Sequence, residues 1–281
     1  MPDTQLTVIK PKSGWFEINF RELFKYRDLI SLFVKRTFTS QYKQTILGPA
    51  WAIIQPLLTT VIFTIIFGNI AKLPTDGVPP FLFYMCANVP WTYFSNCITQ
   101  TSNTFVSNAY IFGKVYFPRL IIPISNVITG LISYAIQFVF FLCFLAYYLL
   151  TPGCSVHITA YALMMPLFVI QMSLLSLGFG IIVSSLTTKY RDLTMLVGFG
   201  VQLWMYATPI AYPSSIIPEK WMALYMLNPM SPIIEYFRYA FLGCGSIDWK
   251  YIGISAAMTL VILAIGVILF SKVEKTFMDT V

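Results

Sequence analysis

The sequence predicts an all-α membrane protein with six transmembrane helices, an N-terminal amphipathic interface helix and two short external helices between the fifth and sixth spans. Of the 281 residues, 57% are hydrophobic and only 10% are charged, whereas soluble domains carry about 25% charged residues. The charges cluster between long uncharged runs. Six of these runs are long enough for a membrane-crossing helix, which needs about 20 residues. They cover roughly residues 47–69, 81–106, 120–150, 158–186, 193–212 and 250–271.

Lysine and arginine are distributed unequally between the two sides of these spans. Most of the 18 fall in the N-terminal segment, the connections after the second and fourth spans, and the tail. The positive-inside rule therefore places both termini in the cytoplasm. The net charge of +7 is mostly this topology signal, with anionic membrane lipids as its partner, and we expect no nucleic-acid partner. The chain divides into a cytoplasmic segment 1–46, a six-helix domain 47–271 and a cytoplasmic tail 272–281. No cleavable signal peptide is predicted, so the first span is expected to direct insertion.

The first element is an amphipathic helix over residues 20–38, with Asn19 as its N-cap. Seven apolar residues fall within an arc of about 140° when each residue turns the helix by about 100°. They are Phe20, Leu23, Tyr26, Ile30, Phe33, Val34 and Phe38. We expect this helix to lie in the cytoplasmic interface of the membrane. It is either a lipid anchor or a docking surface for a cytoplasmic partner.

The second span has no charge but has one polar face. That face consists of Asn88, Thr92, Ser95, Asn96, Thr99 and Asn103, with Trp91 at its border. Polar side chains are costly against lipid, so the face must contact protein or a water-filled path. Hydrogen bonding between helices is the alternative explanation.

The first and fifth spans place aromatic residues beside amides. Trp51, Gln55 and Thr59 share a face of the first span, and Phe199, Gln202 and Tyr206 share a face of the fifth. Aromatic rings suit the apolar faces of sugars and amides suit sugar hydroxyls, although the same residues also suit helix packing. A substrate path would be lined by these residues and by part of the second span. The candidates are Trp51, Gln55, Thr59, Asn88, Trp91, Thr92, Asn96, Phe199, Gln202 and Tyr206.

Residues 213–249 are too hydrophobic for an ordinary loop. Prolines suited to a first helical turn predict two short external helices, 218–227 and 232–242. The supporting residues are Pro218 and Pro232, Ser231 as a cap, and Gly243 as a stop. Glu235 and Arg238 have the spacing of an ion pair. Such helices, within about 213–245, form either a lid over an exit path or two membrane-surface helices.

The sequence predicts neither catalysis nor metal binding by this chain. His157 is the only histidine, and the five cysteines lack metal-ligand spacing. Two of these, Cys154 and Cys244, are both predicted to be external, and whether they pair is left open. The Gly113-Lys114 pair has Asn108 where a phosphate-binding loop requires its first glycine. Active transport would therefore draw its energy from another chain or from an ion gradient.

The order of motifs along the chain resembles the membrane subunit of ABC exporters for lipid-linked polysaccharides, the Wzm/TagG type. The matching stretches are Tyr26-Arg27-Asp28-Leu29, Gln41 to Trp51, Gln55-Pro56, Lys114 to Arg119, Tyr190 to Leu193, Thr208-Pro209-Ile210, Tyr212-Pro213, Asn228-Pro229, Arg238 and Glu274 to Asp279. One departure is Met278, where the family pattern has a small residue.

The resemblance implies a homodimer in the bacterial cytoplasmic (inner) membrane, driven by two copies of a separate ATPase subunit that binds ATP and Mg. The implied substrate is a lipid-linked O-antigen, capsule-like glycan or teichoic acid precursor. The first, second and fifth spans would line its path. The implied ATPase-coupling residues are Arg27, Asp28, Lys35, Arg36, Lys114, Tyr116, Arg119 and Arg191. The implied external gate residues are Pro213, Pro218, Pro229, Glu235 and Arg238.

Three other functions stay open at this point. The first is a permease of the same class for another amphipathic substrate, a lipid or a drug. The second is an ion-coupled secondary transporter, which would require intramembrane carboxylates or an internal repeat. The third is a membrane-embedded transferase, which would require a set of ionisable catalytic residues.

Overall fold

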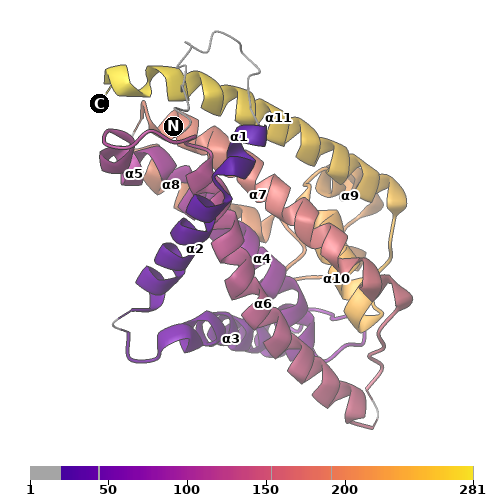
Figure 1. Cartoon of the computed structure of the whole chain (residues 1–281). Helices are drawn as coiled ribbons and strands as arrows, with labels where there is room; N and C mark the ends of the chain where they lie inside the picture. The colour runs from indigo at the N-terminus through magenta and orange to yellow at the C-terminus, as the bar shows by residue number, and fades with distance from the viewer. Residues whose placement is uncertain (1–19, 44, 153, 191, 281) are drawn as a thin grey trace.

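The computed structural model describes residues 20–43, 45–152, 154–190 and 192–280, and every regular element within these ranges is a helix (Figure 1). The α-helices are α1 (Phe20–Lys25), α2 (Arg27–Tyr42), α3 (Trp51–Phe63), α4 (Pro80–Ser102), α5 (Thr104–Phe112), α6 (Ile121–Leu150), α7 (Met165–Thr187), α8 (Leu193–Tyr206), α9 (Glu219–Met226), α10 (Met230–Leu242) and α11 (Trp249–Thr280). A π-helix, Thr64–Ile70, extends α3, and short 3-10 helices occupy Gly48–Ala50, Ala160–Met164 and Ser214–Ile216.

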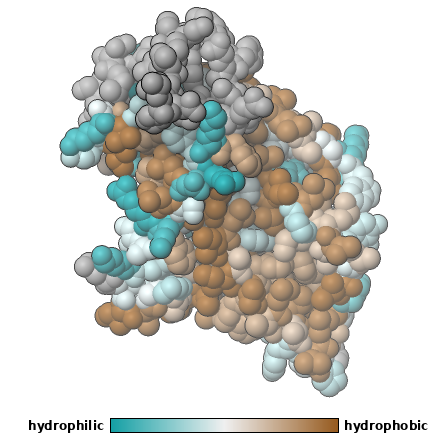
Figure 2. Space-filling model, viewed as in Figure 1, coloured by the Kyte–Doolittle hydropathy of each residue, from teal (hydrophilic) through white to brown (hydrophobic). Residues whose placement is uncertain are grey.

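Four helical stretches in the described part of the chain are long and apolar enough to cross a membrane. They are Gly48–Ile70, Ile121–Leu150, Ala160–Thr187 and Trp249–Glu274. They correspond to the first, third, fourth and sixth predicted spans. The chain is therefore an all-α, multi-pass membrane protein. Figure 2 shows the matching broad apolar surface across the body of the bundle.

The second and fifth predicted spans differ from these four. The predicted span 81–106 is broken at Asn103, where α4 ends and α5 begins. The Asn103 amide there donates to the backbone oxygen of Thr99. The predicted span 193–212 ends early, because α8 stops at Tyr206. Pro209 follows closely and has no N–H with which to continue the helix. The expected lengths of both spans are corrected accordingly.

α4 occupies the centre of the bundle. It packs against α3, α6, α7, α8 and α10, and most of its side chains are buried. A helix surrounded by protein does not have to be apolar on every face, because few of its side chains meet lipid. This position explains how α4 accommodates the polar face that lowers its hydropathy.

Most connections between helices gather at two ends of the bundle (Figure 1). α1 and the C-terminal part of α11 lie at the same end as α5 (Figure 1). There the backbone N–H of Arg119 donates to a Glu274 carboxylate oxygen at 3.2 Å. At the opposite end, the Ser155 hydroxyl donates to the backbone oxygen of Gly77 at 2.8 Å. The 113–120 connection and the end of α11, which the charge pattern assigned to one side of the membrane, are thus found together.

The predicted N-terminal amphipathic helix is present, but it is interrupted at Tyr26 between α1 and α2 and it extends to Tyr42. Phe33 is buried, and Tyr26, Leu29 and Ile30 pack on the same apolar cluster, which includes residues of α5 and α6. The apolar face of α2 therefore covers this protein's own helices. The predicted N-cap, Asn19, lies outside the described residues.

The two predicted short external helices are observed as α9 and α10. α10 begins two residues earlier than expected, and its first N–H, from Met230, is capped by the Asn228 side chain at 3.1 Å. Ser231 is therefore not the cap. Gly243, at φ 71°, ends α10 as predicted. Nearly all of α10 is buried, whereas α9 is exposed, so only α9 lies on the surface of the chain.

Candidate functional site

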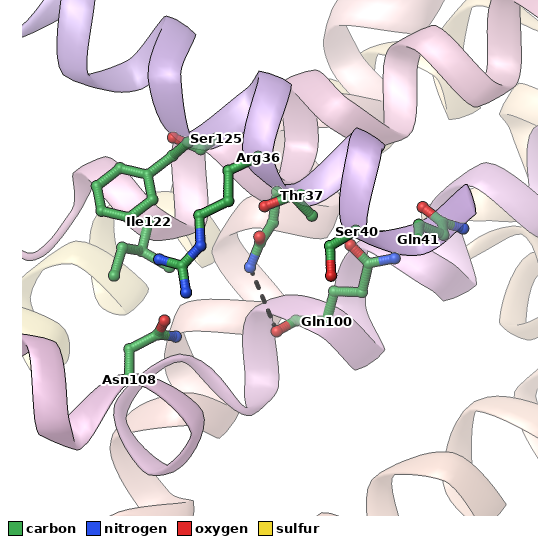
Figure 3. A pocket seen from close by; sticks show the side chains of 10 residues that line it. Arg36, Thr37, Ser40, Gln41, Gln100, Asn108, Ile122 and Ser125 are labelled. Carbon is green, nitrogen blue, oxygen red and sulfur yellow. Dashed lines mark hydrogen bonds between the residues drawn. The ribbon is translucent and has the colours of Figure 1, made fainter. Parts of the chain in front are cut away.

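A polar groove runs between α2, α4 and α6, and it has a wide part, bordered also by α5, and a narrow part, bordered also by α3. The wide cavity has a volume of about 430 Å³ and is lined by Phe33, Arg36, Thr37, Ser40, Gln41, Gln100, Asn108, Ile122, Ser125 and Asn126 (Figure 3). The narrow cavity, of about 70 Å³, is lined by residues of α2, α3, α4 and α6, including Trp51, Gln55, Thr92, Asn96 and Ser133. Gln41 and Gln100 line both cavities and connect them.

Four of the ten predicted path residues meet in the narrow cavity. Trp51 and Gln55 reach it from α3, and Thr92 and Asn96 reach it from α4. The helical spacing that predicted a shared face for each pair therefore brings the two faces together. The sequence did not indicate that α2 and α6 would complete the same cavity. Their contribution depends on how α2 packs along α6, where the Tyr42 hydroxyl is 3.3 Å from that of Ser133.

Asn88 and Trp91 are buried inside the single chain. The Asn88 amide donates to the backbone oxygen of Pro56 and to the Thr60 hydroxyl, both at 3.3 Å. Trp91 packs against Phe94, with ring centroids 5.5 Å apart. Asn88 thus makes the kind of interhelical hydrogen bond that was the alternative explanation for the polar face. A role for either residue in a substrate path stays a prediction.

The α8 residues do not line the groove. Phe199, Gln202 and Tyr206 are exposed on the outside of the chain. α8 is attached to the bundle through Trp204, whose ring lies 4.8 Å from Phe179 and 5.2 Å from Phe94 by centroid distance. Thr59, the remaining predicted path residue, is partly exposed, and its hydroxyl donates to the backbone oxygen of Gln55.

The predicted coupling elements, α2 and residues 113–120, touch each other. Phe117 in this connection lies 5.7 Å from Phe33 of α2 by ring centroids. Tyr116 is exposed, and the Lys114 ammonium group contacts the Tyr110 side chain. The Arg119 guanidinium donates to the backbone oxygen of Glu274.

The coupling residues on α2 lie on its exposed side. Arg27 and Asp28 are exposed, and the Arg27 Nε atom lies 3.8 Å from the Asp28 Oδ1 atom. Lys35 and Arg36 are also exposed, and Arg36 in addition lines the wide cavity. Arg191 lies outside the described residues.

Arg238 forms a buried polar junction at the opposite end of the bundle. Its guanidinium lies 3.2 Å from the Glu235 carboxylate, which confirms the predicted ion pair. It also donates to the backbone oxygens of Tyr212, at 3.2 Å, and Ile210, at 3.0 Å. The guanidinium carbon sits 3.8 Å from the centre of the Phe83 ring. Arg238 thereby joins α10 to α4 and to the segment that follows α8.

The sequence predicted this pair from spacing but did not indicate its burial. Arg238 is only 1% exposed. The three predicted gate prolines differ, since Pro213 and Pro229 are buried and Pro218 is exposed.

Within the described ranges, no group of three or more His, Cys, Asp or Glu side chains is placed to hold a metal ion. Cys154 and Cys244 are both free thiols.

Known proteins match this chain over most of its length. The family model described as ABC-2 type transporter matches residues 28–242, which include the groove and Arg238. An "O-antigen export system permease protein RfbA" of Klebsiella pneumoniae is 30% identical over 252 residues, which are 90% of this chain and 94% of that protein. A Myxococcus xanthus protein of the same name is 25% identical over 264 residues, 93% and 98% of the two chains. The "Polysialic acid transport protein KpsM" of Escherichia coli is 22% identical over 245 residues, 87% and 93%.

Proposed function

The chain belongs to the ABC-2 type transporter family, and from this membership we propose that it is the membrane subunit of an ATP-driven exporter of a lipid-linked polysaccharide. It works as a homodimer with two separate ATPase subunits in the bacterial cytoplasmic membrane. ATP and Mg bind to those subunits, and this chain contributes no catalytic residue. The observation that carries the proposal is the similarity to O-antigen export permeases over 90% of the chain.

The chemistry of the polar groove supports a sugar substrate. Amide and hydroxyl side chains make up most of its polar lining, and Trp51 adds an aromatic ring. Uncharged polar groups can exchange hydrogen bonds with sugar hydroxyls, and an aromatic ring can cover the apolar face of a sugar. A permease for a lipid or drug would be expected to present a mainly apolar surface.

The arrangement of the helices supports six membrane crossings with both termini in the cytoplasm. α4 has 23 residues and so is about 35 Å long, enough to cross a hydrocarbon core of about 30 Å. α8, with 14 residues, reaches about 21 Å. The buried segment after it, held by Arg238, completes the fifth crossing.

The exposed face of α8 supports a path between two subunits. Phe199, Gln202 and Tyr206 lie outside the single chain, where a second copy could bring them next to α3. Two-fold symmetry is the commonest arrangement of oligomers. In this dimer, α2 and residues 113–120 rest on the ATPase, while α9 and α10 close the external end.

Reconstitution with the candidate ATPase tests the proposal. The two chains should co-purify, ATP turnover should require both, and vesicles should accumulate the lipid-linked glycan only when ATP is supplied. The matched control is an ATPase with its catalytic base removed, which should assemble but transport nothing. Failure of the two chains to associate in both detergent and nanodiscs would refute the exporter. ATP-dependent movement of a simple lipid without glycan transport would favour the lipid permease.

A further inference from the structure

The wide cavity combines one positive charge with many uncharged polar groups. Arg36 is the charged residue in its lining, and the described lining includes no carboxylate. Figure 3 shows the Arg36 side chain reaching into the cavity toward Asn108. Thr37, the next residue of α2, and Ser40, one turn further along, add hydroxyl groups to the same lining. A guanidinium beside hydroxyl donors suits a phosphate oxygen.

Hydrogen bonds hold two of the amides that line the cavity. The Asn126 amide donates to the backbone oxygen of Gln100 at 3.4 Å. The Asn108 amide donates to the backbone oxygen of Thr104 at 2.9 Å. Each of these amides keeps a carbonyl oxygen as an acceptor. The cavity therefore offers acceptors for hydroxyl groups next to a cation for a phosphate.

The depth of the cavity matches that of lipid headgroups. α6 has 30 residues and is about 45 Å long, so it extends beyond a hydrocarbon core of about 30 Å. Ile122 and Asn126 belong to its first two turns, at the end of the bundle that also holds α5 and residues 113–120. The positive-inside assignment places that end in the cytoplasm. The narrow cavity, lined by Ser133 of α6, lies deeper.

We propose that the wide cavity binds the phosphate of a lipid headgroup in the cytoplasmic leaflet, with Arg36 on the phosphate and the fixed amides on adjoining hydroxyl groups. Two lipids share this chemistry. One is an anionic phospholipid with a hydroxylated headgroup. The other is the phosphate-linked sugar of a lipid-linked polysaccharide, and that source rests on the proposed function. Gln41 and Gln100 then connect the headgroup site to the narrow cavity.

Native mass spectrometry of the full chain with dioleoyl phosphatidylglycerol tests the site. Charge-assisted hydrogen bonds predict that Arg36→Gln weakens binding by about tenfold or more. Arg36→Lys keeps the charge and should bind with intermediate affinity. Lys43→Gln is the matched control, because Lys43 is exposed, caps the same helix and lies outside the cavity lining. It should bind within about twofold of the wild type, since exposed charges act weakly. Phosphatidylcholine, which has no headgroup hydroxyl, should bind more weakly to the wild type.

The same assay separates the two lipid sources. A polyprenyl pyrophosphoryl sugar that displaces phosphatidylglycerol from the wild type, but fails to bind the Arg36→Gln variant, identifies the site as one for the substrate. Retention of phosphatidylglycerol against that competitor identifies a site for membrane lipid. Equal losses in Arg36→Gln and Lys43→Gln, or no loss in either, overturn the proposal. Because no ATPase is present, this result is independent of the co-purification that tests the proposed function.

Discussion

At the scale of single residues, Arg238 shows how a charge can be kept inside a bundle. Its guanidinium is neutralised by Glu235 and is also hydrogen-bonded to two backbone oxygens. Breaking a buried pair by removing one partner costs far more than replacing both, because the remaining charge stays uncompensated. The buried pair thus makes α10 depend on the segment that follows α8.

This dependence predicts an asymmetric result for stability. Arg238→Gln should lower the free energy of unfolding by about 3 to 5 kcal/mol, because it leaves the Glu235 carboxylate buried without a cation. Glu235→Gln combined with Arg238→Gln should recover part of that loss. Thermal unfolding in detergent, followed by tryptophan fluorescence, measures both variants. A double variant less stable than Arg238→Gln alone would contradict this account.

Trp51 gives a functional prediction at the same scale. It lines the narrow cavity while much of its ring stays exposed. Trp51→Ala should reduce glycan export several-fold and leave assembly with the ATPase intact, because a ring that stacks on sugar is lost. Export is measured as surface glycan. Leu58→Ala is the control, since Leu58 is exposed on the same helix outside the groove. Unchanged export by Trp51→Ala would reject the stacking role.

The sequence predicts contacts within one helix but not contacts that depend on how two helices pack together. The Glu235–Arg238 pair follows from helical spacing within one element. The bond from Asn88 to Pro56 depends on which face of α3 meets α4, and short-range periodicity does not contain that information. Arg36 was expected to act in coupling, and only the packing of α2 on α6 revealed the cavity beside it.

At the scale of elements, α7 and α11 approach closely where Gly178 and Gly266 meet. A Cβ atom added at Gly266 would lie 2.7 Å from the backbone oxygen of Gly178. One added at Gly178 would lie 3.0 Å from the backbone of Leu263. Small residues at such contacts allow membrane helices to pack at short range.

Gly266→Ala should therefore destabilise the protein, because the neighbouring backbone atom cannot move aside as a flexible side chain would. Gly253→Ala is the matched control on α11, since no atom lies within 4 Å of its added Cβ. Thermal unfolding in detergent should show a lower midpoint for Gly266→Ala and an equal or higher one for Gly253→Ala. Equal midpoints for both variants would show that the helices adjust without cost.

The 113–120 connection gives the second prediction for an element. Lys114 is exposed, whereas Arg119 is hydrogen-bonded to Glu274 of α11. Lys114→Glu should uncouple ATP hydrolysis from export without affecting stability, while Arg119→Glu should also lower the unfolding midpoint. ATP turnover, export and thermal unfolding are measured on each variant. If Lys114→Glu exports at the wild-type rate, Lys114 has no role in coupling and contributes only to the charge bias that sets the membrane topology.

At the scale of the whole molecule, the apolar runs and charge bias predicted the helices and the grouping of their connections, because both depend on the bilayer. The end of α8 and the break between α4 and α5 depend on local backbone chemistry around Pro209 and Asn103. The polar groove requires residues from α2, α3, α4, α5 and α6. The sequence predicted the polar residues that α3 and α4 contribute to this groove. It did not predict which other helices would pack beside them to complete it.

The orientation of the whole molecule can be tested through its thiols. Cys154 is partly exposed at the end predicted to be external, whereas Cys244 is buried. Burial also raises the pKa of the Cys244 thiol to about 12, so near neutral pH this thiol stays protonated and unreactive. A membrane-impermeant maleimide applied to right-side-out spheroplasts should therefore label Cys154 quickly, and Cys154→Ser should abolish that labelling.

Val115→Cys, added to the Cys154→Ser variant, provides the cytoplasmic control because Val115 is exposed in the 113–120 connection. It should react only after the membrane is permeabilised, and its labelling in intact spheroplasts would contradict the orientation proposed for the exporter.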